Sequence, residues 1–323
     1  MREILRIENL KKYFPVQRGL FKKNMGAIKA VDDLSISIKE SQIFGLVGES
    51  GCGKSTVGRT ILRFWELTSG RVIFKNRDIT DVDKKSLKKL KSEMQMIFQD
   101  PSASLNPRMR IGTSIERAMK IHTSYNGSDR REKIVALLKK MGLQPEHYNR
   151  YPHELSGGQQ QRVGIARALA VEPSFIVLDE ATSALDVSVQ AQILNLLKVL
   201  HRELKLTYLF ISHNLSVIDH FCSHIAVMYA GKIVEIADRD TLFKSPKHPY
   251  TQSLLSSIPE IGRQKEGSRV VLKGEVPSPE TPPAGCRFHP RCFKMSGKCK
   301  LEEPQMIEVE KGHLLACHLV DLK

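Results

Sequence analysis

The segment IFGLVGESGCGKST, residues 43–56, constrains the fold more than any other part of this 323-residue chain. Its apolar start, residues 43–47, predicts a buried strand, and a glycine-rich loop with the spacing G-x-x-x-x-G-K-S follows it. The next residues, TVGRTILRFW, predict a helix. When a strand, a glycine-rich loop and a helix follow in this order, the loop N–H groups and the positive end of the helix dipole can bind the same anion. The segment therefore predicts an α/β domain that binds nucleotide phosphates.

The residue types in this loop suit the parts of a nucleoside triphosphate. Its glycines let the backbone curl around phosphate oxygens. The Lys54 ammonium would neutralise the β and γ phosphates, and the Ser55 hydroxyl would ligate Mg²⁺. Cys52 reads as a small apolar filler. The expected nucleotide-binding residues here are Gly48, Ser50, Gly51, Gly53, Lys54, Ser55 and Thr56.

The segment FIVLDE supplies acidic residues for the same chemistry. Residues 175–178 predict a buried strand of a parallel sheet, which brings Asp179 to the carboxyl end of that strand. Asp179 would hold the Mg²⁺ shell. Glu180 could orient or deprotonate the attacking water as a general base.

The segment LSGGQQQRVGIARALA begins with five residues that resemble the signature sequence of ATP-binding cassette (ABC) ATPases. A helix that starts with small residues offers a second phosphate-binding surface. The resemblance implies that this surface faces the nucleotide of a partner subunit, with two ATP molecules between the subunits of a head-to-tail dimer. The implied contact residues are Ser156, Gly157, Gly158 and Gln159.

Four more positions match this family one by one. The resemblance implies that Tyr13 stacks on adenine, although an ordinary core tyrosine would look the same by itself. It implies that Gln99 touches Mg²⁺ and signals to the membrane partner, and that His213 contacts the γ-phosphate. Asp186 ends the segment SALD, which resembles the segment that communicates across the dimer in this family. The implied catalytic residues are Glu180, His213, Gln99 and Lys54, and the implied Mg²⁺ ligands are Ser55, Gln99 and Asp179.

The order of elements favours an α/β fold with a largely parallel sheet. We expect an ABC-type P-loop ATPase core at residues 1–105 and 161–245, and a helical signature subdomain at 106–160, where Ser128 would cap one helix. Nine of the fifteen prolines lie in residues 246–323, which predicts a small, irregular appendage there. The cysteines clustered in this region predict that the appendage binds metal.

The last region also carries a resemblance. The segments SPKHPYTQSLL and PPAGCRFHPRC are similar to the tail of ATPases that serve oligopeptide and dipeptide importers, and LKKYFPVQRGLF favours their F-type subunit. This implies an ATPase at the cytoplasmic face of the membrane that powers peptide import. Its implied partners are a related D-type ATPase or a second copy, two permease subunits that dock near residues 100–150, and, indirectly, an extracytoplasmic peptide-binding protein.

Four of the six cysteines lie in the last 38 residues, with the spacing Cys286-x5-Cys292-x6-Cys299-x17-Cys317. Four thiolates can hold tetrahedral zinc or a [4Fe–4S] cluster, and this spacing fits neither a zinc ribbon nor a bacterial ferredoxin. The resemblance favours iron–sulfur, because some peptide-importer ATPases with this tail carry such a cluster. Zinc and four free thiols are the alternatives. Three nearby histidines could replace a thiolate: His289, His313 and His318.

The charge balance leaves a rival class open. The formal net charge of +15 favours an acidic partner, such as nucleotide phosphates, nucleic acid or an anionic membrane face. A soluble ABC ATPase acting on nucleic acid is one alternative, and a regulatory ATP-binding subunit with little turnover is another. We expect no nucleic-acid partner, because the sequence has no recognisable nucleic-acid module. The first residues do not read as a signal peptide, and no apolar run approaches the roughly 20 residues that cross a bilayer.

Overall fold

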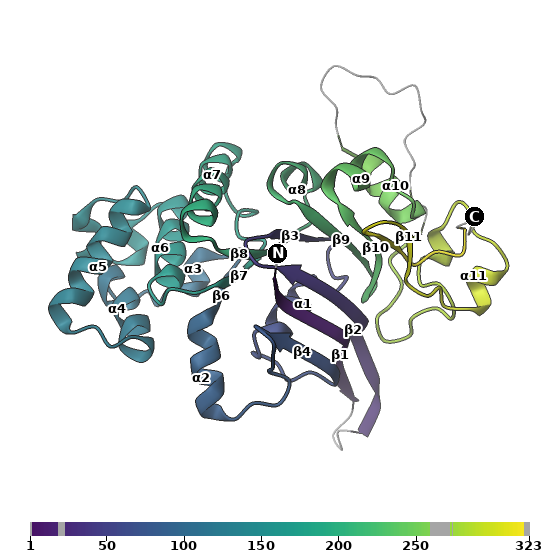
Figure 1. The fold of residues 1–323 in the computed structure, drawn as a ribbon, viewed down its shortest axis with the longest axis horizontal. Helices are drawn as coiled ribbons and strands as arrows, with labels where there is room; N and C mark the ends of the chain where they lie inside the picture. Colours follow the sequence, from purple (N-terminus) through teal and green to yellow (C-terminus); the bar gives the residue numbers. More distant parts are fainter. Residues whose placement is uncertain (1, 19–22, 259–271, 273, 320–323) are drawn as a thin grey trace. The chain divides into compact units, whose positions relative to one another are not determined.

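The computed structural model (Figure 1) describes residues 2–18, 23–258, 272 and 274–319. The chain falls into two units. The first unit comprises residues 1–39, 43–80 and 211–323, and the second comprises 40–42 and 81–210. The boundaries of these two units differ from those of the predicted core, helical subdomain and tail. The division into those three regions therefore stays a prediction. Among the described residues, no helix is both long and apolar enough to cross a membrane.

An antiparallel sheet opens the first unit. Its strand order is β2-β1-β4-β5, and the strands span β1 (Glu3–Arg18), β2 (Lys23–Lys39), β4 (Ser69–Phe74) and β5 (Arg77–Asp78). The end of β2 alternates buried Leu34, Ile36 and Ile38 with exposed polar residues. This period of two places one face of the strand in the core and the other in solvent.

A second group of strands in the first unit has the order β11-β12-β10-β9-β3. Strands β3 and β9 are parallel, whereas β9, β10, β12 and β11 pair antiparallel, so that the chain's last hairpin extends the edge beyond β10 (Figure 1). The strands are β3 (Ile43–Val47), β9 (His224–Tyr229), β10 (Lys232–Asp238), β11 (Ile307–Glu310) and β12 (His313–Leu315). The sequence predicted an irregular tail, so the hairpin β11–β12 was not expected.

The helices of the first unit are short. They are α1 (Lys54–Ile61), α8 (Leu215–Phe221), α9 (Arg239–Lys244), α10 (Pro249–Ser256) and α11 (Lys298–Leu301), with the 3₁₀ turn η3 at His289–Arg291. Proline at the first position of α10 fits the N-terminus of a helix, because its missing N–H would be unpaired there in any case.

The second unit combines parallel strands with a layer of helices. Strands β6 (Met94–Ile97) and β7 (Phe175–Asp179) pair parallel, and β8 (Thr207–Ser212) lies next to β7 and runs to the unit boundary. All five residues of β7 are buried, which confirms the buried strand predicted at 175–178. The core of this unit is therefore α/β, as expected.

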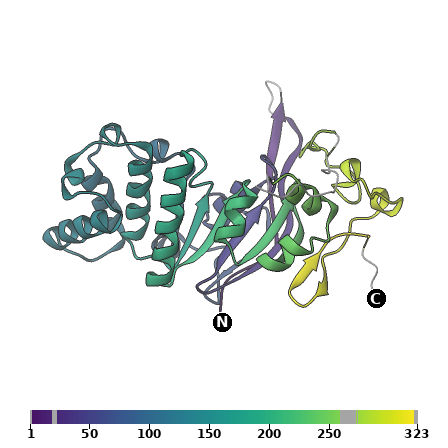
Figure 2. The ribbon, with the colours of Figure 1, turned by 90° about the horizontal axis from the view of Figure 1, so that it is seen from above.

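The helices of the second unit are α2 (Lys84–Glu93), α3 (Pro101–Ser104), α4 (Ile111–His122), α5 (Gly127–Lys140), α6 (Gly157–Leu169) and α7 (Val187–Leu204), with 3₁₀ turns at Pro145–Asn149 (η1) and Pro152–Glu154 (η2). The helices of residues 111–204 lie side by side, in teal in Figure 2. Helix α6 contacts α3, α4, α5 and α7.

The start of α5 corrects one expectation. Ser128 was expected to cap this helix, but Asn126 is the N-cap, and its side chain accepts a hydrogen bond from the Asp129 N–H at 3.0 Å. Ser128 lies in the first turn, and its hydroxyl donates to Asn126 Oδ1 at 2.7 Å. Asparagine and serine are about equally good N-cap residues, and the N-cap of α5 is Asn126, which precedes Ser128 in the sequence.

Candidate active site

The glycine-rich loop lies between the end of β3 and the start of α1. All three of its glycines have positive φ values, 156° at Gly48, 79° at Gly51 and 107° at Gly53. A Cβ on Gly48 would lie 2.1 Å from the Met228 carbonyl oxygen, and one on Gly53 would lie 2.0 Å from the Ala30 carbonyl oxygen. Only glycine fits at these two positions, so the loop can follow its tight path next to β9 and β2.

Lys54 is held inside this loop. Its side chain is 4% exposed, and Nζ donates hydrogen bonds to the carbonyl oxygens of Gly48 and Glu49, both at 2.8 Å. The N-cap of α1 is Gly53, which provides no side chain to cap the first N–H groups of the helix. A buried ammonium and a helix N-terminus converge on the loop, and this donor set fits the phosphates of a nucleotide.

Tyr13 lies half-buried on β1, and its hydroxyl donates a hydrogen bond to Asp32 on β2. Burial and the hydrogen bond to Asp32 raise the pKa of Tyr13, so its hydroxyl stays protonated near neutral pH. Burial alone would raise the pKa of Asp32, but the Tyr13 hydrogen bond and the charges of Lys232 and Arg287 outweigh it and lower that pKa. The pair therefore consists of a neutral phenol and an ionised carboxylate.

The end of the chain contacts this loop, which sequence reasoning missed. The guanidinium of Arg291 forms two hydrogen bonds with the Glu49 carboxylate, at 2.8 and 3.3 Å. The Tyr250 hydroxyl accepts a hydrogen bond from the Glu49 N–H at 2.9 Å. No sequence pattern links positions 49, 250 and 291, because their meeting depends on the path of the last 78 residues.

His213 follows β8 directly, and its side chain is exposed. It belongs to the first unit, as do Tyr13 and the glycine-rich loop. Every other position predicted for nucleotide chemistry lies in the second unit, which is described by itself.

In the second unit, Gln99 and Asp179 follow parallel strands. Ile97 is in register with Leu178, so the carboxyl ends of β6 and β7 lie at the same edge of the sheet. Asp179 is the last residue of β7 and is 3% exposed, whereas Gln99 is exposed two residues after β6. This edge brings together two of the side chains that were predicted to bind Mg²⁺.

Glu180 begins a tight turn after β7. Its φ is 48°, a left-handed value that is uncommon for residues other than glycine. The Ser183 N–H donates to the Glu180 carbonyl oxygen at 3.0 Å, and the buried Gln161 amide donates to the Ala181 carbonyl oxygen at 2.7 Å. Since Gln161 belongs to α6, the acidic turn is tied to the helix that carries the signature sequence.

The signature sequence forms the N-terminus of α6. Ser156 is the N-cap: its hydroxyl accepts from the Gln159 N–H at 3.4 Å, and its own N–H donates to Gln159 Oε1 at 3.0 Å. This reciprocal capping box stabilises the start of the helix, while Ser156 and Gly157 remain exposed. A Cβ on Gly158 would lie 2.5 Å from a methyl group of Val189, so glycine lets α7 approach closely.

Asp186 caps α7. Its carboxylate accepts hydrogen bonds from the Val189 N–H at 2.9 Å and from the Ser188 hydroxyl at 2.7 Å. These two bonds lower the pKa of Asp186. The carboxylate is exposed and ionised near neutral pH, and it has a structural role within its own unit.

A hollow of about 330 Å³ lies in the second unit, beside α3, α4 and α6. Arg167 forms part of its wall and donates to the Ser104 carbonyl oxygen at 2.6 Å. The hollow is lined by Gln95, Ser104, Asn106, Met109, Ser114, Arg117, Ala118, Ile121, His122, Arg167 and Val171. Most of these residues fall within or near the region that was predicted to dock a permease.

The four cysteines of the tail lie close enough to influence one another's charge. Burial and the other three thiols raise the pKa of Cys286 to about 11, and the Cys286 N–H donates to the Cys299 carbonyl oxygen at 2.9 Å. All six cysteines of the chain are free thiols, and Cys52 and Cys222 are buried. In the described ranges, no three or more Cys, His, Asp or Glu side chains are grouped so that they could hold a metal ion.

The three histidines near the cysteines have other partners. His313 Nε2 lies 2.7 Å from Glu235 Oε1, and both side chains are fully buried. Nitrogens of His289 and His318 lie 3.0 Å from the Cys286 carbonyl oxygen and 2.8 Å from the Glu302 carbonyl oxygen, respectively. These contacts give each histidine a role in holding the local backbone or core.

Comparison with known proteins relates both halves of the chain to transporters. The family described as ABC transporter matches residues 31–183, and the family described as oligopeptide/dipeptide transporter, C-terminal region, matches residues 234–299. The oligopeptide transport ATP-binding protein AppF of Bacillus subtilis (strain 168) is 49% identical over 321 residues, which cover 98% of this chain and 97% of that protein. The dipeptide transport ATP-binding protein DppF of Escherichia coli (strain K12) is 43% identical over 318 residues and covers 98% of this chain and 95% of its own length.

Solved structures agree with this relationship. The cbiO1 protein of Clostridium perfringens, part of the ABC transporter complex cbiONQ, superposes with a TM-score of 0.64 at 25% identity, covering 76% of this chain and 92% of its own. The ATP-binding cassette MJ0796, as a dimer bound to ADP and Pi, gives 0.64 at 29% identity, covering 73% of this chain and 99% of its own.

The fold and the glycine-rich loop thus define an ABC-type P-loop ATPase. Within this class, the chain belongs to the ATP-binding subunits of the oligopeptide/dipeptide ABC transporter family. Such a subunit is an ATPase whose hydrolysis of ATP is coupled to transport across a membrane.

Proposed function

We propose that this chain hydrolyses ATP to ADP and phosphate and thereby powers the import of oligopeptides or dipeptides through a permease. The observation that carries the proposal is the glycine-rich loop, with Lys54 held beneath a helix N-terminus. The match to peptide-transport ATP-binding proteins over 98% of the chain supports the peptide cargo.

The loop residues have separate tasks in this proposal. Lys54 binds the β and γ phosphates, and the N–H groups of residues 48–56 surround their oxygens. Tyr13 stacks on adenine. Its ring is half-buried at the edge of the core, so that an adenine base could pack against the exposed face of the ring.

The hydrolytic residues act on the γ-phosphate. Glu180 orients the attacking water and accepts its proton, while His213 donates a hydrogen bond to a γ-phosphate oxygen. The residues that would hold Mg²⁺ are Ser55, Gln99 and Asp179, and the carboxylate and the two neutral oxygens suit this hard cation. When bound, Mg²⁺ neutralises charge on the β and γ phosphates.

We further propose that two cassettes close on ATP head to tail. Ser156, Gly157, Gly158 and Gln159 would then face the nucleotide of the partner, which is a D-type subunit or a second copy. The exposure of Ser156 and Gly157 at the start of α6 supports this role. Asp186, exposed at the start of α7, would carry the closure from one cassette to the other.

Two permease subunits at the cytoplasmic face of the membrane complete the proposed assembly. The hollow beside α3, α4 and α6 suits an inserted helix end, because it combines apolar and polar lining residues. Closing and reopening of the cassettes would move this hollow and switch the permease between its two states. An extracytoplasmic binding protein would deliver the peptide, so this chain itself needs no peptide contact.

For the tail, we propose a [4Fe–4S] cluster on Cys286, Cys292, Cys299 and Cys317, with zinc as the alternative. Four thiols in one small region supply the donor set that either metal requires. The described arrangement is not yet a ligand set, so the side chains would have to turn inward when the metal binds. The bound group would crosslink this proline-rich segment and stabilise its fold.

The test of the proposed function uses Glu180→Gln. We expect this variant to bind ATP as the wild type does and to hydrolyse it about 10²- to 10⁴-fold more slowly, the usual contribution of a general base. ATPase activity is measured in proteoliposomes that contain the permease, with and without peptide-loaded binding protein. Near-normal turnover by the variant would remove Glu180 from its role, and hydrolysis that peptide and permease leave unchanged would refute the coupling to import.

The nucleic-acid alternative is checked with the same protein. Salt-dependent binding to duplex DNA or RNA, with stimulation of hydrolysis, would favour a nucleic-acid ATPase. Permease-dependent stimulation would exclude both this alternative and a regulatory subunit with little turnover.

A further inference from the structure

A buried ion pair connects the C-terminal tail to Tyr13. Arg287 is 7% exposed, and its guanidinium donates to the Asp32 carboxylate, which in turn accepts the hydrogen bond from the Tyr13 hydroxyl. Lys232 lies 3.9 Å from the same carboxylate. One carboxylate oxygen of Asp32 thus binds Arg287 of the tail, and the other binds the Tyr13 hydroxyl. The position of Arg287 therefore affects the position of the Tyr13 ring.

Arg287 also holds the turn between β9 and β10. It donates to the Ala230 carbonyl oxygen, and the next residue, Gly231, accepts from the Asp32 N–H at 2.9 Å and donates to the Cys52 carbonyl oxygen at 2.9 Å. A Cβ on Gly231 would lie 2.9 Å from the Arg287 guanidinium. The turn therefore touches the tail, β2 and the glycine-rich loop together.

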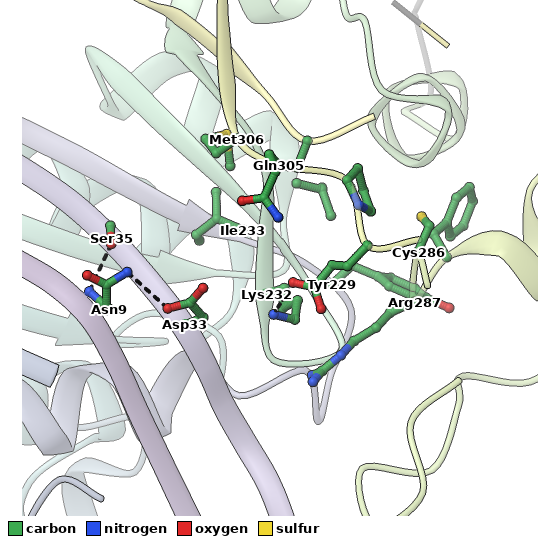
Figure 3. A pocket seen from close by; sticks show the side chains of 15 residues that line it. Asn9, Asp33, Ser35, Tyr229, Lys232, Ile233, Cys286, Arg287, Gln305 and Met306 are labelled. Carbon is green, nitrogen blue, oxygen red and sulfur yellow. Dashed lines mark hydrogen bonds and ion pairs between the residues drawn. The ribbon is translucent and has the colours of Figure 1, made fainter. Parts of the chain in front are cut away.

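Figure 3 shows the surroundings of this contact. A cavity of about 200 Å³ lies between the N-terminal sheet and the tail, and Arg287, Lys232 and Cys286 line it on the side opposite Asn9 and Asp33. The neighbouring ring of Phe288 packs edge-on against Tyr229, with ring centres 5.1 Å apart. Arg287 is thus fixed by packing on its C-terminal side and by ion pairing at its head.

A second arginine of the tail contacts the beginning of the glycine-rich loop. Arg291 binds the Glu49 carboxylate with both terminal nitrogens, at 2.8 and 3.3 Å, and only 9% of its side chain is exposed. A two-point contact between a planar guanidinium and a carboxylate fixes orientation as well as distance. Glu49 lies directly after Gly48, so Arg291 holds the beginning of the phosphate loop.

We propose that Arg287 and Arg291 are positioning residues of the nucleotide site: Arg287 orients Tyr13 through Asp32, and Arg291 orients the phosphate loop through Glu49. This inference rests on the proposed function, because it takes Tyr13 as the adenine platform and residues 48–56 as the phosphate site. Arg287 directly follows Cys286 in the sequence, and Arg291, the last residue of η3, directly precedes Cys292. A change in the fold of the tail therefore reaches the two ends of the site by separate contacts.

The two contacts can be separated by comparing a ligand that has a base with one that lacks it. We would measure the dissociation constants of Mg²⁺·ATP and Mg²⁺·tripolyphosphate for the full chain by calorimetry. Stacking of one base on an aromatic ring is worth about 1–3 kcal/mol, so the ratio of the two constants in the wild type is expected to be about 5- to 150-fold in favour of ATP.

The main variant is Arg287→Met, and Arg291→Met is its charge-matched control. Arg287→Met should reduce the preference for ATP by about 5-fold or more and leave the affinity for tripolyphosphate within about 2-fold of wild type. Arg291→Met should weaken both ligands by the same factor and leave the ratio unchanged. Asp32→Asn gives a second, smaller change in the Arg287 contact, and thermal unfolding identifies any variant that is not folded.

A double-mutant cycle distinguishes positioning from a general loss of structure. Tyr13→Phe keeps the ring but removes the hydroxyl that binds Asp32, so Arg287→Met should have little further effect on the ratio in that background. If Arg287→Met changes the ratio equally in the wild type and in the Tyr13→Phe variant, the inference is overturned. An unchanged ratio in folded Arg287→Met would overturn it as well.

The variant Tyr13→Ala shows whether a negative result refutes the positioning role of Arg287 or the proposed role of Tyr13 as the adenine platform. If Tyr13→Ala leaves the preference for ATP intact, Tyr13 is not the adenine platform, and that part of the proposed function is wrong. If Tyr13→Ala abolishes the preference but Arg287→Met and Asp32→Asn preserve it, the platform stands and only the positioning role of Arg287 is refuted.

Discussion

The buried His248 predicts how the stability of this protein depends on pH. Its side chain is 1% exposed at the N-cap of α10, where Nδ1 accepts a hydrogen bond from the Tyr250 N–H at 3.0 Å. Burial lowers the pKa of His248 from 6.5 to about 3. Between these two values the unfolded chain binds a proton at this position and the folded chain does not, so stability falls as the pH falls.

The magnitude follows from the two pKa values. Each pH unit well below 6.5 costs about 1.4 kcal/mol per proton, and integration from pH 6.5 to pH 5 gives a loss of about 2 kcal/mol in the free energy of unfolding. The matched variant is His248→Asn, because an asparagine oxygen can also cap α10 but does not titrate.

The assay is urea unfolding of both proteins at pH 7, 6.5, 6, 5.5 and 5. Other groups titrate in this range, so the informative quantity is the difference between the two free energies at each pH. The wild type should lose about 2 kcal/mol more than His248→Asn between pH 6.5 and pH 5. Parallel curves for the two proteins would refute the reasoning, because His248 would then bind its proton equally in both states.

Two further predictions concern the tail. Strictly anaerobic protein should contain about four irons and four acid-labile sulfides per chain and a visible chromophore that bleaches with dithionite, whereas one zinc without colour would establish the alternative metal. His313→Ala should lower the free energy of unfolding by about 1–3 kcal/mol, since it leaves the fully buried Glu235 side chain without its histidine partner. A loss below about 1 kcal/mol in urea unfolding would show that the two backbone N–H groups bound to Glu235, from Lys247 and His248, satisfy it.

The nucleotide-binding elements could be predicted from sequence because their signals are local. The glycine-rich loop needs glycine wherever the backbone meets another carbonyl oxygen, and at Gly48 and Gly53 this need coincides with the motif. The buried strand before Asp179 likewise shows as an uninterrupted apolar run. In such elements the residue and its structural reason lie within a few positions of each other.

The contacts of the tail could not be predicted, because each joins positions far apart in the chain. Asp32 and Arg287 are 255 residues apart, and Glu49 and Arg291 are 242 apart. A charged residue in a single sequence reads as solvated surface unless its partner is known. The hairpin β11–β12 was missed for a related reason: its strands have only four and three residues, too few to show a period of two.

These long-range pairs make the tail part of the folded nucleotide unit. Removing residues 246–323 would deprive Glu49 of Arg291, Asp32 of Arg287 and Glu235 of His313. A partly or fully buried carboxylate that loses its partner keeps the cost of its desolvation. We therefore expect a chain ending at residue 245 to unfold at a lower temperature than the full chain, and to bind ATP more weakly even with every loop residue present. Equal unfolding temperatures and equal ATP affinities for the two lengths would show that the cassette is complete without its tail.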